Sequence, residues 1–167
     1  MLSVKPCDIP DHAFLRAYAA EGAYADCYVT DIHMPVSQTQ YIQAFYTTPL
    51  FRLERLILTL AVSRPSTDED VQALAQGSTG RFSAWDVEKR DEAQLLLRDF
   101  MGRTRSWLMA KRENDATTRL YFGSAVVPKL KARPYDSHHR PPLLAFHRLY
   151  SVFLLSSATS RLLGSAS

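Results

Sequence analysis

The chain contains 167 residues, of which 46% are hydrophobic and 22% charged. This size and composition are typical of one folded domain and exclude a disordered or fibrous protein. The formal net charge is only +3 and the basic residues are scattered, whereas a nucleic-acid-binding protein usually concentrates them on one face. We therefore expect a single domain over residues 1–167, with its core at about residues 20–163, and no nucleic-acid partner.

Two features of the sequence favour a cytoplasmic protein. Residues 1–9 hold no hydrophobic stretch of the kind found in signal peptides, so the two cysteines, Cys7 and Cys27, are expected to be reduced thiols. The most hydrophobic stretch, residues 143–155, is interrupted by His147 and Arg148 and is shorter than the roughly 20 residues that a membrane span needs. We therefore expect no membrane span.

The N-terminal part of the chain predicts one helix and one strand. Apolar residues have helical spacing within residues 11–20, and Gly22 is suited to end that helix. In residues 24–32 the kind of side chain then alternates from one residue to the next, and this period of two is typical of a β-strand.

Three helices are predicted to follow this strand. Ser37 and Gln40 form an S-x-x-Q capping box, so the first of them begins there. The pair Thr48–Pro49 supplies the N-cap and the first-turn proline of a second helix. A third and more polar helix begins after Thr67 and ends at Gly77.

From residue 81 onward the pattern becomes alternating and predicts an antiparallel run of four strands. Their expected ranges are residues 81–89, 94–100, 104–112 and 119–127. A loop is expected over residues 129–142, and a last helix from residue 142 or 143 to residue 163. Apolar side chains cover more than half the circumference of that helix, so it is expected to be enclosed on several sides.

The turn between the second and third of these strands decides which side chains share a face. A three-residue turn with Gly102 in the left-handed conformation places Leu97 opposite Arg105, and puts Trp107 on the same face. A two-residue turn would instead place Arg98 opposite Arg105, a like-charge pair that costs energy. The three-residue turn is therefore favoured.

The predicted elements follow one another in the order of the helix-grip fold. They resemble the START-like superfamily, which includes START lipid-transfer domains, birch-pollen-allergen-like proteins and polyketide cyclases (SRPBCC). The resemblance implies an α+β fold with two to three helices between the first two strands, and a curved antiparallel sheet of about five or more strands wrapped around the long C-terminal helix. Four strings also resemble an uncharacterised bacterial domain family over about residues 20–163, namely Tyr24–Cys27, Ala44–Phe51, Gly102–Leu108 and Thr118–Ser124. That family supplies no catalytic residues.

The resemblance also implies a ligand cavity between the sheet and the last helix. The candidate ligand-binding residues are Trp85, Arg105, Trp107, Tyr121, Phe146, Tyr150 and Phe153. If Arg105 and Trp107 point inward beside Asp99, they could clamp an anionic or carbonyl-bearing ligand. If that face points outward, Arg105 belongs to a surface charge network. Trp85 and Asp86 must point to opposite faces, and Trp85 is expected in the core.

No metal site and no cofactor are expected. His138 and His139 adjoin in a loop, and the only acidic or cysteine side chain at a supporting short spacing is Asp136. The motifs of nucleophilic hydrolases, nucleotide-binding proteins and zinc proteases do not occur.

Three functions stay open. The first is binding or transport of a small hydrophobic or amphipathic molecule in the cavity, with Arg105 or a tyrosine fixing its polar end. The second is a cofactor-free enzyme of the cyclase or hydratase kind, with Asp86, Asp99 or Tyr121 as its acid–base group. The third is a structural protein with a filled core. The sequence predicts no oligomeric state.

Overall fold

A computed structural model describes residues 3–53, 63–127 and 141–165, although not the side chains of residues 141–148. Over these residues the protein is an α+β protein with a seven-stranded antiparallel sheet in the spatial order β1-β2-β7-β6-β5-β4-β3, which confirms the predicted class. The strands are β1 (Lys5–Pro6), β2 (Tyr24–Ile32), β3 (Arg81–Phe82), β4 (Trp85–Arg90), β5 (Gln94–Asp99), β6 (Thr104–Asn114) and β7 (Thr117–Val126). The described helices are α1 (Arg16–Ala20), α2 (Gln38–Tyr46), α4 (Asp68–Gln76) and α5 (Pro141–Ser165), and residues 49–53 are also helical. None of the described helices is long and apolar enough to cross a membrane.

Local capping interactions account for the helix starts. The Ser37 hydroxyl accepts a hydrogen bond from Gln40 N at 3.2 Å, and the Gln40 side chain accepts one from Ser37 N at 2.9 Å, so the predicted capping box is confirmed. Thr67 caps α4 in the same way with Asp70, and Gly77 ends that helix with a φ of 77°.

Several predicted elements differ in extent from those observed. The helix predicted over residues 11–20 is limited to α1. The strand predicted over residues 81–89 is two strands, because Ser83 adopts a φ of 53° in a tight turn between β3 and β4. The two-residue strand β1 was not predicted, since it is too short to show an alternating pattern. The predicted 129–142 loop lies outside the described residues up to residue 140.

The predicted register of the β5–β6 hairpin is wrong. Arg98 lies opposite Arg105, and Leu96 lies opposite Trp107. The Asp99 carboxylate accepts hydrogen bonds from the backbone N–H groups of Arg103 and Thr104, at 2.6 and 2.8 Å, and so closes a longer loop than expected. A shift of one residue moves side chains to the other face of a sheet. Arg105 and Trp107 therefore do not share a face with Leu97.

Carboxylates on β4 offset the repulsion in this register. Asp86 lies 3.8 Å from the Arg98 guanidinium, and Glu88 lies 2.8 Å from Arg105 Nε. The two arginines thus form part of a mixed-charge group. The pairwise argument for the three-residue turn failed because it considered two strands, whereas the third strand supplies the counter-charges.

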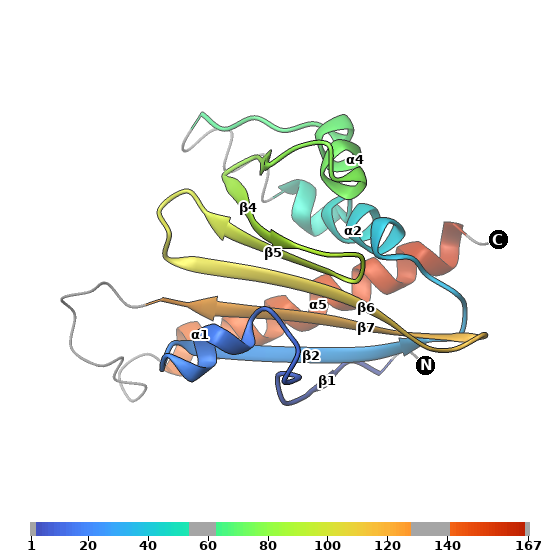
Figure 1. The fold of residues 1–167 in the computed structure, drawn as a ribbon, viewed down its shortest axis with the longest axis horizontal. Helices are drawn as coiled ribbons and strands as arrows, with labels where there is room; N and C mark the ends of the chain where they lie inside the picture. The colour runs from blue at the N-terminus through green and yellow to red at the C-terminus, as the bar shows by residue number, and fades with distance from the viewer. Residues whose placement is uncertain (1–2, 54–62, 128–140, 166–167) are drawn as a thin grey trace.

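Both faces of the sheet are covered, and α1 and α5 lie on opposite sides of it (Figure 1). On the α5 face, α2, α4 and α5 pack over a large core that includes Phe45, Leu97, Leu108 and Phe122. On the α1 face, the segment before β2 packs over a second cluster. Its buried members are Ala13, Leu15, Cys27, Leu96, Trp107, Met109 and Ala125.

The last helix is less enclosed than its composition predicts. Leu154, Leu155, Ala158 and Leu162 are buried against the sheet and α2. Phe153 and Leu149, by contrast, are 62% and 59% exposed. The expectation of a helix covered on several sides is therefore wrong for the described part of α5, because its apolar circumference is wider than the surface that α2 and the sheet contact.

Gly123 allows the α1 face to pack closely over β7. A Cβ atom at this position would lie 2.7 Å from Leu15 Cδ2 and 2.9 Å from the backbone oxygen of Asp26. The Asp26 oxygen belongs to β2 and cannot move without disturbing that strand. We expect Gly123→Ala to lower the free energy of unfolding by about 1 to 2 kcal/mol, measured by urea denaturation. Gly80→Ala is the control, because a Cβ there meets nothing within 4 Å; equal losses in both variants would contradict this explanation.

Candidate functional site

A cavity of about 240 Å³ lies between the sheet and α5. Its walls come from α2, α5 and strands β4, β6 and β7, together with residues next to these elements. The lining residues are Phe45, Phe51, Trp85, Thr104, Arg105, Ser106, Phe122, Ser124, Ala125, Val126, Tyr150 and Leu154. The space is therefore bounded mainly by aromatic and aliphatic groups, with a few hydroxyls.

Side chains alternate between the two faces along each strand, which brings Ser106, Phe122 and Ser124 to the α5 face. Trp85 packs against the core on that face, and Asp86 pairs with Arg81 and Arg98 on the other. The prediction that Trp85 and Asp86 separate, with Trp85 in the core, is confirmed. On β6 and β7, Ser106 lies opposite Ser124, so two small hydroxyl side chains leave room where larger residues would fill the space.

Polar side chains also line the cavity, among them those of Ser124, Ser106 and Trp85. The Ser124 hydroxyl donates to Asp26 Oδ1 at 2.7 Å, and the Ser106 hydroxyl lies 3.5 Å from Tyr46 Oη. Trp85 Nε1 is buried, and it has no hydrogen-bond partner among the described residues. An indole N–H can only donate, and leaving such a group buried without an acceptor is unfavourable. The cavity wall therefore includes a residue that carries an unpaired donor.

The candidate ligand-binding residues divide between the two faces. Trp85 and Tyr150 line the cavity. Arg105 borders it, but its guanidinium lies on the α1 face, 4.6 Å from the centre of the Tyr18 ring. Trp107 and Tyr121 pack in the α1-face cluster. Of the remaining two, Phe153 is exposed, and the Phe146 side chain is outside the described residues.

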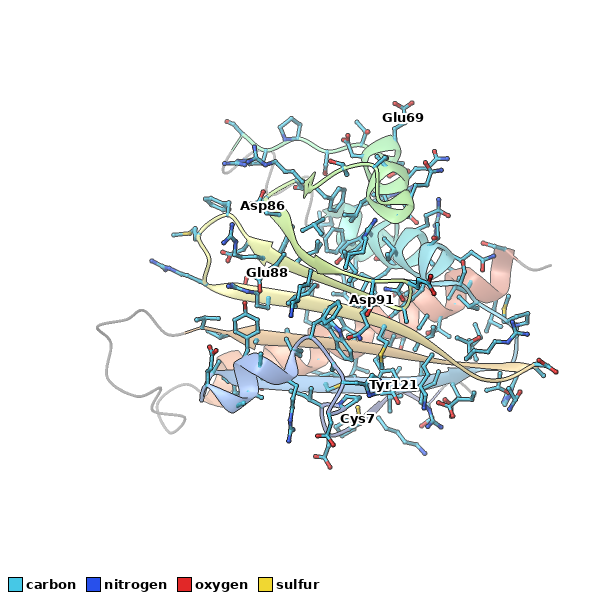
Figure 2. The ribbon with its side chains drawn as sticks, in the orientation of Figure 1. Cys7, Glu69, Asp86, Glu88, Asp91 and Tyr121 are labelled. Carbon is cyan, nitrogen blue, oxygen red and sulfur yellow. The ribbon has the colours of Figure 1, made fainter. Side chains whose placement is uncertain are left out.

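Arg105 is the centre of a charged group under α1. Its side chain is only 9% exposed and is paired with Glu88 of β4, whose position Figure 2 shows. The Tyr18 hydroxyl also donates to Glu88, and burial, followed by this hydrogen bond, raises the pKa of Tyr18. Arg105 Nη1 donates to the backbone oxygens of Gly102 and Thr104. The contacts among Arg105, Glu88 and Tyr18 hold α1 on the sheet. Together these interactions keep the Arg105 guanidinium away from the cavity.

None of the three acid–base candidates lines the cavity, although Asp99 lies opposite the lining residue Trp85. Asp86 is paired with arginines on the α1 face. Asp99 accepts backbone hydrogen bonds in the β5–β6 loop. Tyr121 packs near Trp107, with ring centres 6.1 Å apart. None of these three residues lines the space beside α5.

Sequence reasoning missed Asp26 as a neighbour of the cavity. Asp26 alternates with Cys27 along β2 and shares its face with the buried Tyr28. A carboxylate on a strand face shared with the aromatic side chains of Tyr24 and Tyr28 is a recognisable signal, because a partly buried charge requires a partner. The Asp26 carboxylate accepts hydrogen bonds from the Ser124 hydroxyl on the adjacent strand and from the Tyr24 hydroxyl.

The described residues contain no group of three His, Cys, Asp or Glu side chains that could hold a metal ion. The adjacent His138 and His139 lie outside them. Comparisons with protein-family models, curated proteins and solved structures give no significant match for this chain. Its membership of the START-like superfamily therefore remains a prediction.

Proposed function

We propose that this chain is a helix-grip protein whose cavity between the sheet and α5 binds a small, uncharged aromatic molecule that carries a hydrogen-bond acceptor. The proposal is supported by the order of the elements, by the position of α5 across one face of the sheet (Figure 1) and above all by the unpaired Trp85 Nε1 in an aromatic-lined space. A ligand acceptor, such as a carbonyl oxygen, would satisfy this donor.

The volume of the cavity limits the size of the ligand. An apolar cavity of about 150 Å³ accommodates one benzene molecule. The space of about 240 Å³ therefore suits a bicyclic ring system. A long acyl chain or a polycyclic polyketide would need additional room.

The charges near the cavity favour a neutral ligand. The Asp26 carboxylate accepts a hydrogen bond from the lining residue Ser124, and the Asp99 carboxylate accepts one from the backbone N–H of the lining residue Thr104. Arg105, the basic residue that borders the space, directs its guanidinium to Glu88 on the opposite face. Among the described residues that line the space, no other basic side chain is present to compensate an anionic ligand.

The proposal is tested by comparing how the wild type and the Trp85→Phe variant bind 1-tetralone and tetralin. The two ligands have the same bicyclic shape, but only the ketone carries an acceptor. We expect the wild-type protein to bind both in calorimetry, and Trp85→Phe to weaken tetralone binding by roughly five- to tenfold while leaving tetralin binding nearly unchanged, since one neutral hydrogen bond contributes about 1 kcal/mol. Equal weakening for both ligands would show that the indole N–H plays no part.

Ser106→Leu provides the second arm of this experiment. The added side chain projects into the cavity, and the hydroxyl that it replaces makes only a 3.5 Å contact. We expect a folded variant with an unchanged circular dichroism spectrum and no thermal stabilisation by tetralone. Absence of stabilisation of the wild-type protein by either ligand would support a filled structural core and end the binding proposal.

A further inference from the structure

Cys7 and Cys27 form a close pair at the edge of the sheet. β1 pairs with β2 so that Pro6 lies opposite Tyr28, and Cys7 N donates to Cys27 O at 2.9 Å. The two cysteines are therefore direct cross-strand neighbours, a geometry with Cα atoms about 5.5 Å apart, which a disulfide can span. Both are free thiols, and their sulfur atoms lie 3.2 Å apart.

The two thiols differ in access to solvent. Cys7 is half-buried and lines two surface hollows, of about 440 and 610 Å³, the second of which Cys27 also borders. It lies on the same side of the sheet as Tyr121 (Figure 2). Cys27 is buried in the α1-face cluster. A reagent in solution would therefore reach Cys7 first.

We propose that Cys7 and Cys27 are a site of thiol–disulfide exchange with low-molecular-weight disulfides of the glutathione class, and that the resulting protein disulfide fastens the N-terminal segment to the sheet. This inference is independent of the proposed ligand cavity, which lies on the other face. It rests on the cross-strand placement of the two sulfurs and on the difference in their exposure.

The exchange balances in two steps. The Cys7 thiolate attacks one sulfur of the small disulfide, forms a mixed disulfide and releases one small thiolate, which takes up a proton. Cys27 then loses its proton to solvent, and its sulfur attacks Cys7 Sγ and releases the second small thiol. In total the protein gives up two electrons and two protons, and the small disulfide is reduced to two thiols.

The electrostatics agree with this order of attack. The hydrogen bond with Cys27 is the main cause that lowers the pKa of Cys7, whereas the same contact and burial raise the pKa of Cys27. Cys7 is thus the thiol that ionises first. Once its sulfur carries a covalent group, the negative charge beside Cys27 is gone, and Cys27 ionises more readily than before.

The disulfide would enclose α1 and the residues that cover Arg105 and Trp107. A covalent link between residues 20 positions apart restricts the unfolded chain and should raise the melting temperature by about 5 °C or more. Oxidation would therefore strengthen the cover of the α1 face.

The experiment uses the reduced full-length protein with a graded series of oxidised and reduced glutathione. We expect wild type to lose both free thiols, to lose the mass of two hydrogen atoms without a lasting adduct, and to melt at a higher temperature. Cys27→Ser should accumulate one glutathionyl group on Cys7, and Cys7→Ser should remain unmodified while folded. A stable adduct on the wild type, thiols that resist oxidised glutathione, or faster modification of Cys7→Ser than of Cys27→Ser would overturn the proposal.

Discussion

Replacing Gln94 by leucine is expected to lower the free energy of unfolding by about 3 kcal/mol, because this buried amide joins the N-terminal segment to the sheet. Its Oε1 accepts hydrogen bonds from Phe14 N and from Trp107 Nε1, both at 3.0 Å. Its Nε2 donates to the backbone oxygen of His12 at 3.2 Å. Leucine has a similar volume but satisfies none of these groups, and urea denaturation measures the loss.

A second substitution separates hydrogen bonding from packing at this site. Trp107→Phe removes the indole donor, so adding Gln94→Leu to that variant should cost less than adding it to the wild type. Gln76→Leu, at an exposed position of α4, is the control and should change stability by less than about 0.5 kcal/mol. If Gln94→Leu and Gln76→Leu had the same effect, Gln94 would not join the two layers.

The elements of this protein were predictable because their signals are local. The capping box of α2 needs only residues Ser37 and Gln40, and it is observed as predicted. The separation of Trp85 from Asp86 follows from the period of a strand. The antiparallel sheet and the long last helix follow from similar patterns over short windows.

The cover of the second face was not predictable in this way. Tyr18 reaches Glu88 across 70 positions of sequence, and Phe14 reaches Gln94 across 80. No pattern within a short window indicates that the N-terminal segment folds over β5 and β6. Without that cover, Arg105 and Trp107 could be assigned only to the α5 face or to solvent, and the structure places them in a third environment, buried on the opposite face.

The candidate site was likewise predictable only where its residues leave a local signal in the sequence. Trp85 and Tyr150 were identified because large aromatic side chains on a strand and on an apolar helix are expected in a core. Ser106 and Ser124 were not, because a small residue leaves no mark in a hydrophobic pattern. They contribute to the site through the space that they leave, and that space depends on the pairing of β6 with β7.

Arg105→Met is expected to lower the free energy of unfolding by about 2 to 3 kcal/mol, because it leaves the Glu88 carboxylate beneath α1 without its cation. The loss should be smaller than for a fully enclosed pair, since the Glu88 side chain is 24% exposed. Loss of the stacking contact with Tyr18 adds to the effect. Denaturation in urea measures it, and near-ultraviolet circular dichroism reports whether Trp107 keeps its environment.

Arg98→Met is the matched control for this variant. Arg98 lies directly opposite Arg105 on the same face, but its side chain is 49% exposed and lies 3.8 Å from Asp86. A surface pair of this kind contributes less than about 1 kcal/mol. If the two variants differ in stability because Arg105→Met leaves the Glu88 carboxylate unpaired, adding Glu88→Gln to Arg105→Met should recover part of the lost stability. Adding Glu88→Gln to Arg98→Met should instead lower stability further. The opposite ranking would mean that packing of the arginine side chain, and not its charge, holds α1 on the sheet.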